Sequence, residues 1–293
     1  MSTAAIDNLV TYFKKAEVTI IGSSVSIEAL KNHPGIDEYY KLDKKNFSLY
    51  KTAKNLGYFD IFFTFRSSFR ARIFKSFILA NEKYQFDHNK YENRHQVEKY
   101  NDFINTSLGI NLPARRLSLH SDFKNNKRTK KILGINPGAS FGSAKRWYPE
   151  KFAKVAIKLS DNFDILIFGS KDELNFASII ENSIINEGVT NYTNLAGKTS
   201  IQELIREIAN LDLFITGDSG PMHIAASFQI PTISIFGPTR NDETSQWQNK
   251  KNIIVKKNLI CQPCMKRVCP LKHHNCMKQI EVIDVLNAVE KLN

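Results

Sequence analysis

The sequence predicts an α/β fold built from parallel sheets whose strands alternate with helices. Three observations support this prediction. Short apolar runs alternate with segments of helical periodicity, most clearly after residue 131. Glycine or polar residues follow the ends of several apolar runs, where ligands bind in open parallel sheets. The length of 293 residues and the 42% share of hydrophobic residues fit about two globular domains.

The second half of the chain gives the alternation in its clearest form. Short apolar runs, several ending in glycine, predict strands at 132–135, 164–169, 193–197, 213–216 and 232–236. Helix-like segments between them are expected at 149–160, 172–186 and 201–209. This order implies a parallel sheet with helices on both faces.

The first half repeats the alternation more faintly. It opens directly with a helix, and we expect strands at 18–22 and 58–63 and helices at 24–32, 47–55 and 67–80. A polar, basic stretch near the middle of the chain has the character of a linker. We therefore place an N-terminal domain at 1–120, a linker at 121–131, a C-terminal domain at 132–280 and a C-terminal helix at 281–293.

The formal net charge of +12 favours an anionic partner such as a membrane surface, a nucleic acid or a phosphorylated substrate. The alternative is the ordinary surface of a lysine- and asparagine-rich proteome. No basic stretch interleaves with aromatic residues as in an RNA-binding sheet, so no nucleic-acid partner is expected. No apolar run reaches the about 18 residues of a spanning helix, and the N-terminus lacks the apolar core of a secretory signal. A cytoplasmic location is therefore expected.

One run, Gly217-Asp218-Ser219-Gly220-Pro221-Met222-His223, follows an apolar strand and leads into a helix. A carboxylate, a hydroxyl and two glycines at such a turn predict a site for an anion and a sugar, because the first N–H groups of a helix attract phosphate. Pro221 suits the first helical turn. Asp218 is alternatively a helix N-cap, and His223 alternatively packs inside the domain.

Five segments occur in one order, at 136–147, 168–172, 194–199, 217–223 and 236–239. Together they resemble glycosyltransferase family nine, the ADP-heptose:lipopolysaccharide heptosyltransferases, and the segment 269–276 resembles the heptosyltransferase II branch. The resemblance is strong over 131–280 and weaker over 1–118. It implies two Rossmann-like domains facing a cleft, the GT-B architecture, with an N-terminal domain that lacks its first strand.

The resemblance also implies a reaction. Heptose passes from ADP-heptose to the inner core of the lipid A-linked oligosaccharide, with inversion at the anomeric carbon and no obligatory metal. An enzyme of this kind is expected at the inner-leaflet membrane surface, where anionic lipid and a phosphorylated acceptor suit the positive charge. Two alternatives stay open: a family member that uses another donor sugar, and a non-catalytic form that only binds a nucleotide sugar.

By resemblance, the donor site lies in the second half. Lys145 is expected to stabilise the leaving diphosphate, or else to be a surface lysine, and Asp218 is expected to hydrogen-bond the donor sugar. Asp172 and Glu173 suit a ribose diol or, alternatively, cap a helix. The full donor-binding set is Ser140, Ser143, Asp172, Glu173, Lys198, Thr199, Ser219, Gly220, Met222 and His223. Arg146 either assists Lys145 or is structural, as is Trp147, which is expected to pack beneath the loop.

Arginines in the first half are candidates for binding the acceptor. Arg66, Arg70 and Arg72 follow the strand at 58–63, and the guanidinium fork matches phosphate and carboxylate. A nearby segment also resembles the family's acceptor region, through Arg94, His95 and Tyr100. The alternative for each of these residues is a solvated helix face.

The sequence departs from the family at its start. The family opens with a strand and a Gly-Asp loop whose aspartate is the probable general base, whereas Met1-Ser2-Thr3-Ala4 aligns just after that loop. Asp7 is a poor substitute, because about 1 Å of misplacement of a catalytic group is costly. The sequence as given therefore predicts donor binding with little transfer, and indicates a misassigned start or a shortened chain.

Four cysteines, Cys261, Cys264, Cys269 and Cys276, lie in the pattern C-x2-C-x4-C-x6-C. In a reducing compartment they are not expected to form disulfides, and their spacing suits a structural zinc site. His273 and His274 are alternative ligands. Packed free thiols and an iron–sulfur cluster are the other interpretations. No cofactor is expected to be required for the reaction.

Overall fold

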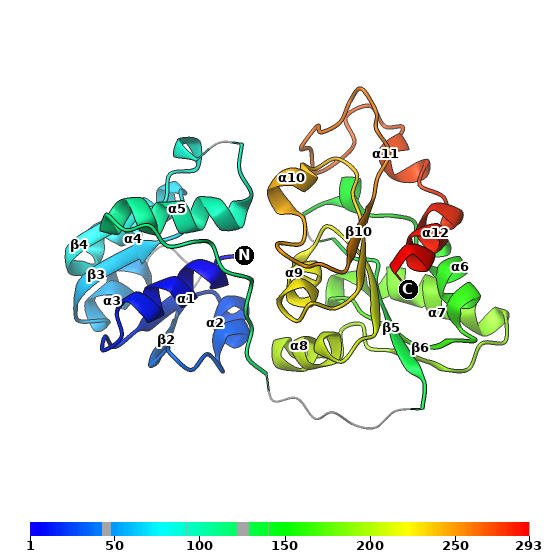
Figure 1. Cartoon of the computed structure of the whole chain (residues 1–293), viewed down its shortest axis with the longest axis horizontal. Helices are drawn as coiled ribbons and strands as arrows, with labels where there is room; N and C mark the ends of the chain where they lie inside the picture. Colours follow the sequence, from blue (N-terminus) through cyan, green and yellow to red (C-terminus); the bar gives the residue numbers. More distant parts are fainter. Residues whose placement is uncertain (43–47, 92, 122–128, 140, 293) are drawn as a thin grey trace. The chain divides into compact units, whose positions relative to one another are not determined.

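The computed structural model describes residues 1–42, 48–91, 93–121, 129–139 and 141–292. The chain divides into two compact units, Met1–His120 and Ser121–Asn293, each of which is described by itself below (Figure 1). Ser140, one of the predicted donor residues, lies outside the described residues.

Unit 2 is built on a six-stranded parallel sheet. Its strands are β5 (Lys131–Asn136), β6 (Phe163–Ile167), β7 (Tyr192–Asn194), β8 (Leu213–Gly217), β9 (Thr232–Ile235) and β10 (Asn252–Val255). Their order across the sheet is β10-β9-β8-β5-β6-β7. Every residue of β8 and β9 is buried, as expected for parallel strands covered on both faces.

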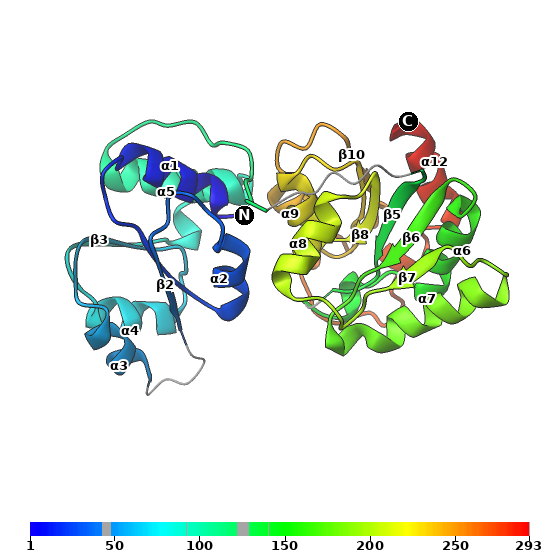
Figure 2. The same cartoon turned by 90° about the horizontal axis from the view of Figure 1, so that it is seen from below.

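Helices cover both faces of this sheet (Figures 1 and 2). On one face, α6 (Pro149–Leu159), α7 (Leu174–Asn186) and α12 (Val282–Leu292) share a core with Ile135, Ile215 and Ile233. On the other face, α8 (Ile201–Ala209) and α9 (Gly220–Ser227) pack around Phe214. Two short helices, α10 (Asn241–Thr244) and α11 (Asn275–Lys278), flank β10 in the sequence.

The connections of this sheet create a topological switch point. From β5 the chain moves to β6 and β7 on one side, and then returns to β8 on the other side of β5. The loops that leave the carboxyl ends of β5 and β8 therefore diverge over opposite faces of the sheet. Ligands of open parallel sheets bind where loops diverge in this way.

Unit 1 contains two separate two-stranded parallel sheets within the described residues. In one, β1 (Thr19–Gly22) pairs with β2 (Glu38–Lys41); in the other, β3 (Tyr58–Thr64) pairs with β4 (Leu79–Gln85). The helices of this unit are α1 (Thr3–Tyr12), α2 (Ser24–Leu30), α3 (Ser48–Asn55), α4 (Phe69–Phe77) and α5 (Gln96–Leu108). Two apolar clusters form its core, one around Leu49 and Phe62 and the other around Ile6 and Leu30.

The alternation of strands and helices confirms the predicted α/β fold. One of the predicted helices, however, is wrong over its last residues. The helix predicted over 67–80 ends at Phe77, and β4 begins at Leu79. Ser68 caps the start of α4, whereas Ile78 is fully buried and has extended dihedral angles. No helix among the described residues has the length and apolar character that crossing a bilayer requires.

Candidate donor site in unit 2

The loops at the switch point are tied together by a polar network. Asn136, the last residue of β5, lies opposite Thr216 of β8. Its side-chain amide donates to the hydroxyl oxygens of Thr216 and Ser219, each at 3.1 Å. Since Asn136 and Thr216 are buried and Ser219 is half-buried, the network fixes the start of both loops relative to the sheet. Ser219, a predicted donor residue, is thus held by its side chain at the base of the site.

Lys145 and Asp218 form a buried ion pair across the switch point. Lys145 lies in a 3-10 turn, Ser143–Lys145, that follows β5, and Asp218 follows β8. The lysine Nζ is 2.5 Å from Oδ2 of Asp218, and Thr239 donates its hydroxyl to the same oxygen at 2.7 Å. All three residues are buried. Lys145 is therefore not a surface lysine, and the sequence alternative that made it one is wrong.

The ammonium group of Lys145 also lies against an aromatic ring. Nζ of Lys145 lies 4.6 Å from the ring centroid of Phe141, and the guanidinium of Arg267 lies 5.3 Å from the same ring. A cation close to an aromatic ring is favoured by the ring's quadrupole. Trp147 packs beneath this loop in the core, with its indole N–H bonded to the carbonyl of Ile280 at 3.0 Å. The structural interpretation of Trp147 is confirmed.

Asp218 does not cap the helix that follows it. The N-cap of α9 is Ser219, whose side chain makes no cap bond, and Pro221 lies in the first turn as predicted. The carboxylate of Asp218 is bound instead to Lys145 and Thr239. The N-cap alternative for Asp218 is therefore wrong. Gly220, the first residue of α9, is exposed, so the N-terminus of this helix is open to a ligand at its first residue.

The two carboxylates after β6, Asp172 and Glu173, have different surroundings. Glu173 is buried and its Oε2 accepts the backbone N–H of Ser170 at 2.8 Å, which confirms the capping alternative for this residue. The same carboxylate lies against Gly138, where an added Cβ would come within 2.1 Å of it. Asp172 is exposed. Of the two side chains, Asp172 is the one open to solvent, and its contact with a ribose stays a prediction.

The remaining donor candidates differ in exposure. Ser143 and Lys198 are exposed, Thr199 and His223 are half-buried, and Met222 is completely buried. Lys198 donates to the carbonyl of Asn194 at 3.0 Å. Any ligand contact at Met222 would have to come from its backbone, because the side chain lies inside the domain. Their assignment to a donor site stays a prediction.

The arginines predicted to bind the acceptor lie at the carboxyl end of β3 in unit 1. Arg66 precedes α4, and Arg70 and Arg72 lie in its first turn. Arg66 and Arg72 are exposed, and Arg66 is close enough to Tyr100 to act on it electrostatically. Burial raises the pKa of Tyr100, while Arg66 opposes that rise. Arg66 and Tyr100, two candidates from different segments, therefore lie close together.

His95 and Arg94 have other partners in the structure. His95 is buried and caps α5, since its Nδ1 accepts the N–H of Val97 at 3.2 Å. Arg94 forms ion pairs with Asp102 and, at 3.3 Å, with Glu98. The solvated helix face expected as the alternative for His95 is wrong, because the imidazole is inside unit 1. An acceptor contact of His95 stays a prediction.

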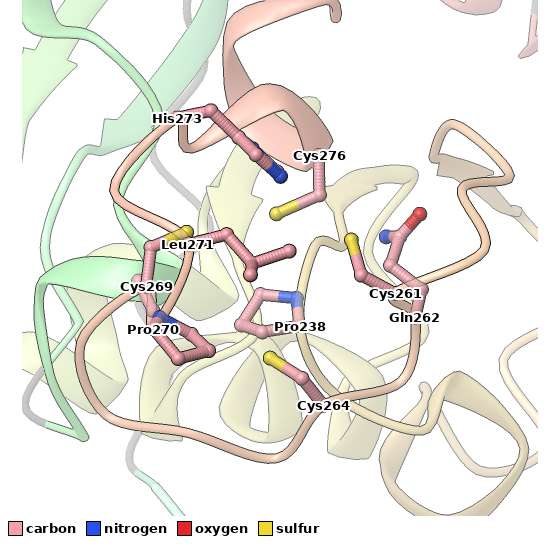
Figure 3. A pocket seen from close by; sticks show the side chains of 10 residues that line it. Pro238, Cys261, Gln262, Cys264, Cys269, Pro270, Leu271, His273 and Cys276 are labelled. Atoms are coloured by element: carbon pink, nitrogen blue, oxygen red, sulfur yellow. The ribbon is translucent and has the colours of Figure 1, made fainter.

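The four cysteines surround one small cavity in unit 2 (Figure 3). All four are free thiols. Burial, and to a lesser extent the nearby Cys269, Cys261 and Cys264, together raise the pKa of Cys276 to about 11. The fold thus brings together the four cysteines that their spacing in the sequence had picked out.

One cluster had no signal in the sequence. Asp7, His33 and His120 place their ligand atoms within 4.8 Å of one another, the one such group of three found in the described part of the chain. Burial acts to raise the pKa of Asp7, but hydrogen bonds from His33 and Ser118 outweigh it, and the pKa lies below its ordinary value. Burial and the neighbouring His33 lower the pKa of His120. No local motif could reveal residues this far apart in the chain.

Two side chains at the candidate donor site were also missed. Thr239 falls in a segment that the sequence analysis used for the resemblance, and Phe141 lies in another, but neither was assigned a role. Their position directly after strand ends was the available signal. Both touch the Lys145–Asp218 pair, Thr239 through the carboxylate and Phe141 through the ammonium group.

The buried lysine–carboxylate pair lies at the switch point of a doubly wound sheet, beside an open helix N-terminus. This arrangement is typical of the class of α/β proteins that bind an anionic ligand at the switch point. Comparison with known proteins is consistent with this class. The family model for glycosyltransferase family 9 (heptosyltransferase) matches residues 64–275. Lipooligosaccharide heptosyltransferase 2 of Campylobacter jejuni is 42% identical over 302 residues, covering 100% of this chain and 93% of that protein.

Two known structures share the fold. That of E. coli ADP-heptose LPS heptosyltransferase II has a TM-score of 0.80 at 21% identity, covering 99% of this chain and 93% of its own. That of E. coli heptosyltransferase WaaC with ADP has a TM-score of 0.78 at 13% identity, covering 100% and 95%. The chain belongs to glycosyltransferase family 9, the heptosyltransferases. The predicted family, GT-B fold and enzyme class are confirmed.

Proposed function

We propose that this enzyme transfers heptose from ADP-heptose to the inner core of lipopolysaccharide, with inversion at the anomeric carbon. The observation that carries the donor part of the proposal is the Lys145–Asp218 pair at the switch point. The similarity to heptosyltransferases whose names and titles specify ADP-heptose and lipooligosaccharide supports this choice of donor and acceptor.

The geometry suggests how each residue acts. Without a donor, Asp218 neutralises the Lys145 ammonium group. A bound diphosphate competes for that ammonium group and for the N–H groups at the start of α9, and Asp218 is then able to accept a sugar hydroxyl. As the bond between the anomeric carbon and the diphosphate breaks, Lys145 offsets the charge that ADP retains, which is electrostatic stabilisation of a leaving group. The acceptor oxygen forms the new bond and releases its proton to a base.

We do not propose Asp7 as that base. Its Oδ1 is 2.8 Å from Nε2 of His33, and its Oδ2 accepts the hydroxyl of Ser118. Both carboxylate oxygens are therefore already engaged in holding unit 1 together. This agrees with the expectation that Asp7 is a poor substitute for a catalytic aspartate.

Calorimetric titration with ADP-heptose and with ADP tests the donor site. We expect Lys145→Ala to weaken binding of both ligands at least about tenfold, since a hydrogen bond to a charged group contributes about 1.5–3 kcal/mol. Asp218→Ala should weaken binding of ADP-heptose by a similar factor but not binding of ADP, because Asp218 is proposed to hold the sugar. Lys158→Ala, an exposed lysine of α6, is the matched control and should bind like the parent chain. Equal binding by all three variants would reject the site. Preference for a different nucleotide sugar would instead favour the alternative donor.

The acceptor is proposed to bind the exposed arginines at the end of β3. Arg66→Ala and Arg72→Ala should raise the KM for a phosphorylated core acceptor and leave ADP affinity unchanged. Lys83→Ala on β4 serves as the control in the same unit. Measuring transfer and ADP binding on the same samples separates loss of the acceptor site from loss of the donor site.

We further propose that the enzyme works at the cytoplasmic face of the membrane. A loop of unit 2 exposes Ile260, Val268 and Leu271, each more than half accessible, beside Lys266 and Lys272. Apolar side chains among basic ones suit an anionic bilayer surface. Free thiols suit a reducing compartment.

Sedimentation with phosphatidylglycerol vesicles tests this surface, with phosphatidylcholine vesicles for comparison. Val268→Asp should reduce binding to the anionic vesicles. Ile283→Asp, at a position of α12 that is also more than half accessible, should not. Binding that is unaffected by Val268→Asp, or that shows no preference for anionic lipid, would contradict the proposal.

A further inference from the structure

The segment 256–274, between β10 and α11, has no regular secondary structure beyond turns. It carries three of the cysteines, and Cys276 follows in α11. We propose that Cys261, Cys264, Cys269 and Cys276 together bind one thiolate-preferring metal ion, zinc or iron, in tetrahedral coordination. A tetrahedral set of four cysteine sulfurs is one of the ligand sets typical of these ions in structural sites.

The first argument is the shared cavity. All four cysteines line one space of about 20 Å³, together with Pro238 and Leu271. Figure 3 shows the sulfur atoms of Cys264, Cys269 and Cys276 turned towards that space, with Cys261 at its edge. A cavity of this size holds little more than a single water molecule, which suits a bare ion and excludes an organic ligand. The sulfur atoms surround the cavity, so binding of the ion draws them inward.

The second argument excludes the neighbouring histidines as ligands. Nε2 of His274 is 3.0 Å from the carbonyl of Ala144, which only accepts, so this nitrogen carries a proton. Its Nδ1 accepts the hydroxyl of Tyr148 at 3.3 Å. In His273, Nδ1 accepts the N–H of Asn275 at 3.0 Å, which leaves the proton of the neutral ring on Nε2. A protonated nitrogen has no lone pair for a metal, so the four sulfurs remain.

The third argument is that the segment has few other constraints. Unstructured loops longer than about 12–15 residues are uncommon and usually functional. Met265, Lys272 and His274 adopt positive φ angles of 54°, 57° and 53°, which cost energy for residues other than glycine. Several of the segment's large apolar side chains point into solvent instead of into a core. A metal ion supplies the constraint that apolar packing does not.

The charge of the segment also suits a thiolate site. Four thiolates around a divalent ion leave a net negative charge, which positive groups nearby offset. Lys266, Arg267 and Lys272 lie between the second and fourth cysteines, and the segment from Cys261 to Cys276 contains no acidic residue. The sequence thus provides cations where a tetrathiolate site needs them.

The competing cluster in unit 1 is a weaker metal site despite its tighter geometry. Nδ1 of His33 accepts the N–H of Gly35 at 3.1 Å, so the neutral ring carries its proton on Nε2. That proton is donated to Asp7 at 2.8 Å. The nitrogen that faces the cluster is therefore a donor and not a ligand. The hydrogen bonds explain this arrangement without an ion.

The proposed metal site reaches the donor site through Ala144. The N–H of Ala144 donates to the carbonyl of Arg267 at 3.0 Å, and the Ala144 carbonyl accepts from His274 at 3.0 Å. The cysteine segment thus holds the backbone of this residue from both sides, and the next residue is Lys145. Loss of the ion is expected to loosen the turn that carries Lys145. This consequence, unlike the site itself, rests on the proposed donor function.

Metal analysis of the purified full-length chain tests the site. After expression with both zinc and iron available and gel filtration, we expect about one equivalent of metal per chain by mass spectrometry. Cys264→Ser and Cys269→Ser should each lose it, and His273→Ala should keep it. Less than about a tenth of an equivalent in the parent chain, together with four freely reactive thiols, would overturn the proposal. Loss of the ion in His273→Ala would overturn the assignment of four sulfur ligands.

A second measurement uses the parent chain alone, so it does not depend on whether the cysteine variants fold. The parent chain is treated with a chelator, its reactive thiols are counted, and cobalt(II) is added. Thiols that become reactive on chelation, and intense thiolate-to-cobalt charge-transfer bands after cobalt is added, are the expected results. Thiols equally reactive before chelation would contradict a bound ion.

The coupling to Lys145 is measured separately on the same samples. ADP affinity should fall about tenfold on chelation, because a small displacement of Lys145 is costly, and should recover when metal is restored. If the parent chain binds metal but no ADP, the donor function fails and the metal site stands. If ADP affinity is the same with and without metal, the coupling is wrong.

Discussion

Lys145 and Asp218 lie 73 residues apart in the sequence and meet because β5 and β8 are neighbours in the sheet. A buried ion pair costs desolvation free energy, which good geometry and further hydrogen bonds offset. Here Thr239 provides the extra bond to the Asp218 carboxylate. A pair maintained at that cost, at the edge of the sheet where ligands bind in open parallel folds, supports the proposed anion site.

Replacement of Thr239 tests how the carboxylate is held. Thr239→Val removes the hydroxyl from a buried, charged acceptor, which we expect to lower the free energy of unfolding of unit 2 by about 1.5–3 kcal/mol. Chemical denaturation followed by tryptophan fluorescence measures this change. Thr193→Val, at an exposed position of β7, is the control and should be close to neutral. A neutral Thr239→Val would mean that the hydroxyl does not support Asp218.

Asp7 has a measurable role in unit 1. Because folding lowers its pKa below the ordinary value of 3.8, the stability that its carboxylate contributes is present above that pH. It is lost as the pH falls through the lower folded pKa. Asp7→Asn should therefore reduce stability by about 1–2 kcal/mol at pH 7, and its difference from the parent chain should shrink below pH 3.8.

Denaturation followed by circular dichroism between pH 7 and pH 3 checks this behaviour. Asp60→Asn, at an exposed position of β3, is the control and should change stability little at any pH. The partners facing Asp7 are His33, Ser118 and His120. A difference between Asp7→Asn and the parent chain that stays constant with pH would show that the carboxylate charge is not what these partners stabilise.

At the scale of elements, the sequence predicted unit 2 better than unit 1. The strands of unit 2 are buried on both faces and therefore read as continuous apolar runs, as in β8. By contrast, β4 has the sequence Leu-Ala-Asn-Glu-Lys-Tyr-Gln, rich in residues that favour helices. It is a strand because it pairs with β3 along its length. Such pairing is a tertiary effect that local propensity does not contain.

The candidate site was also predictable only in part. Lys145 and Asp218 lie in segments with glycine and polar residues directly after strands, so each was found. Their direct contact was not, because it depends on the order of strands in the sheet. The two hydrogen bonds that hold the backbone of Ala144, from its N–H to the carbonyl of Arg267 and from the imidazole of His274 to its carbonyl, were also missed. They join segments more than a hundred residues apart.

The loop that carries Lys145 depends on one close backbone approach. Gly142 has φ of 157°, and an added Cβ would lie 2.3 Å from the carbonyl oxygen of Arg267. Gly142→Ala should therefore displace the cysteine segment or the lysine turn, and weaken ADP binding about tenfold or more. Gly188→Ala is the matched control, because its φ is 75° with nothing within 4 Å of an added Cβ. It should cost only about 1 kcal/mol of stability and leave ADP affinity unchanged, as measured by calorimetry. Similar effects of both variants on affinity would contradict the close-approach argument.

At the scale of the whole molecule, each unit has its own core and its own chemistry. The apolar clusters of unit 1 and those of unit 2 have no residue in common. Lys145, Asp218 and the cysteines belong to unit 2, whereas the arginines proposed to bind the acceptor belong to unit 1. A ligand that binds one unit should therefore stabilise that unit and leave the other unchanged.

The two tryptophans make this separation measurable. Trp147 and Trp247 both lie in unit 2, so fluorescence reports the unfolding of unit 2 alone, while circular dichroism reports both units. A ligand at a hundred times its Kd stabilises the folded state by about 2.7 kcal/mol. ADP at that concentration should raise the fluorescence midpoint by about 5 °C or more and leave a separate transition of unit 1 unmoved. In Lys145→Ala at the same ADP concentration, the shift should shrink. If fluorescence and circular dichroism instead give one coincident transition that ADP moves as a whole, the two units unfold cooperatively, and the independence inferred from their separate cores is wrong.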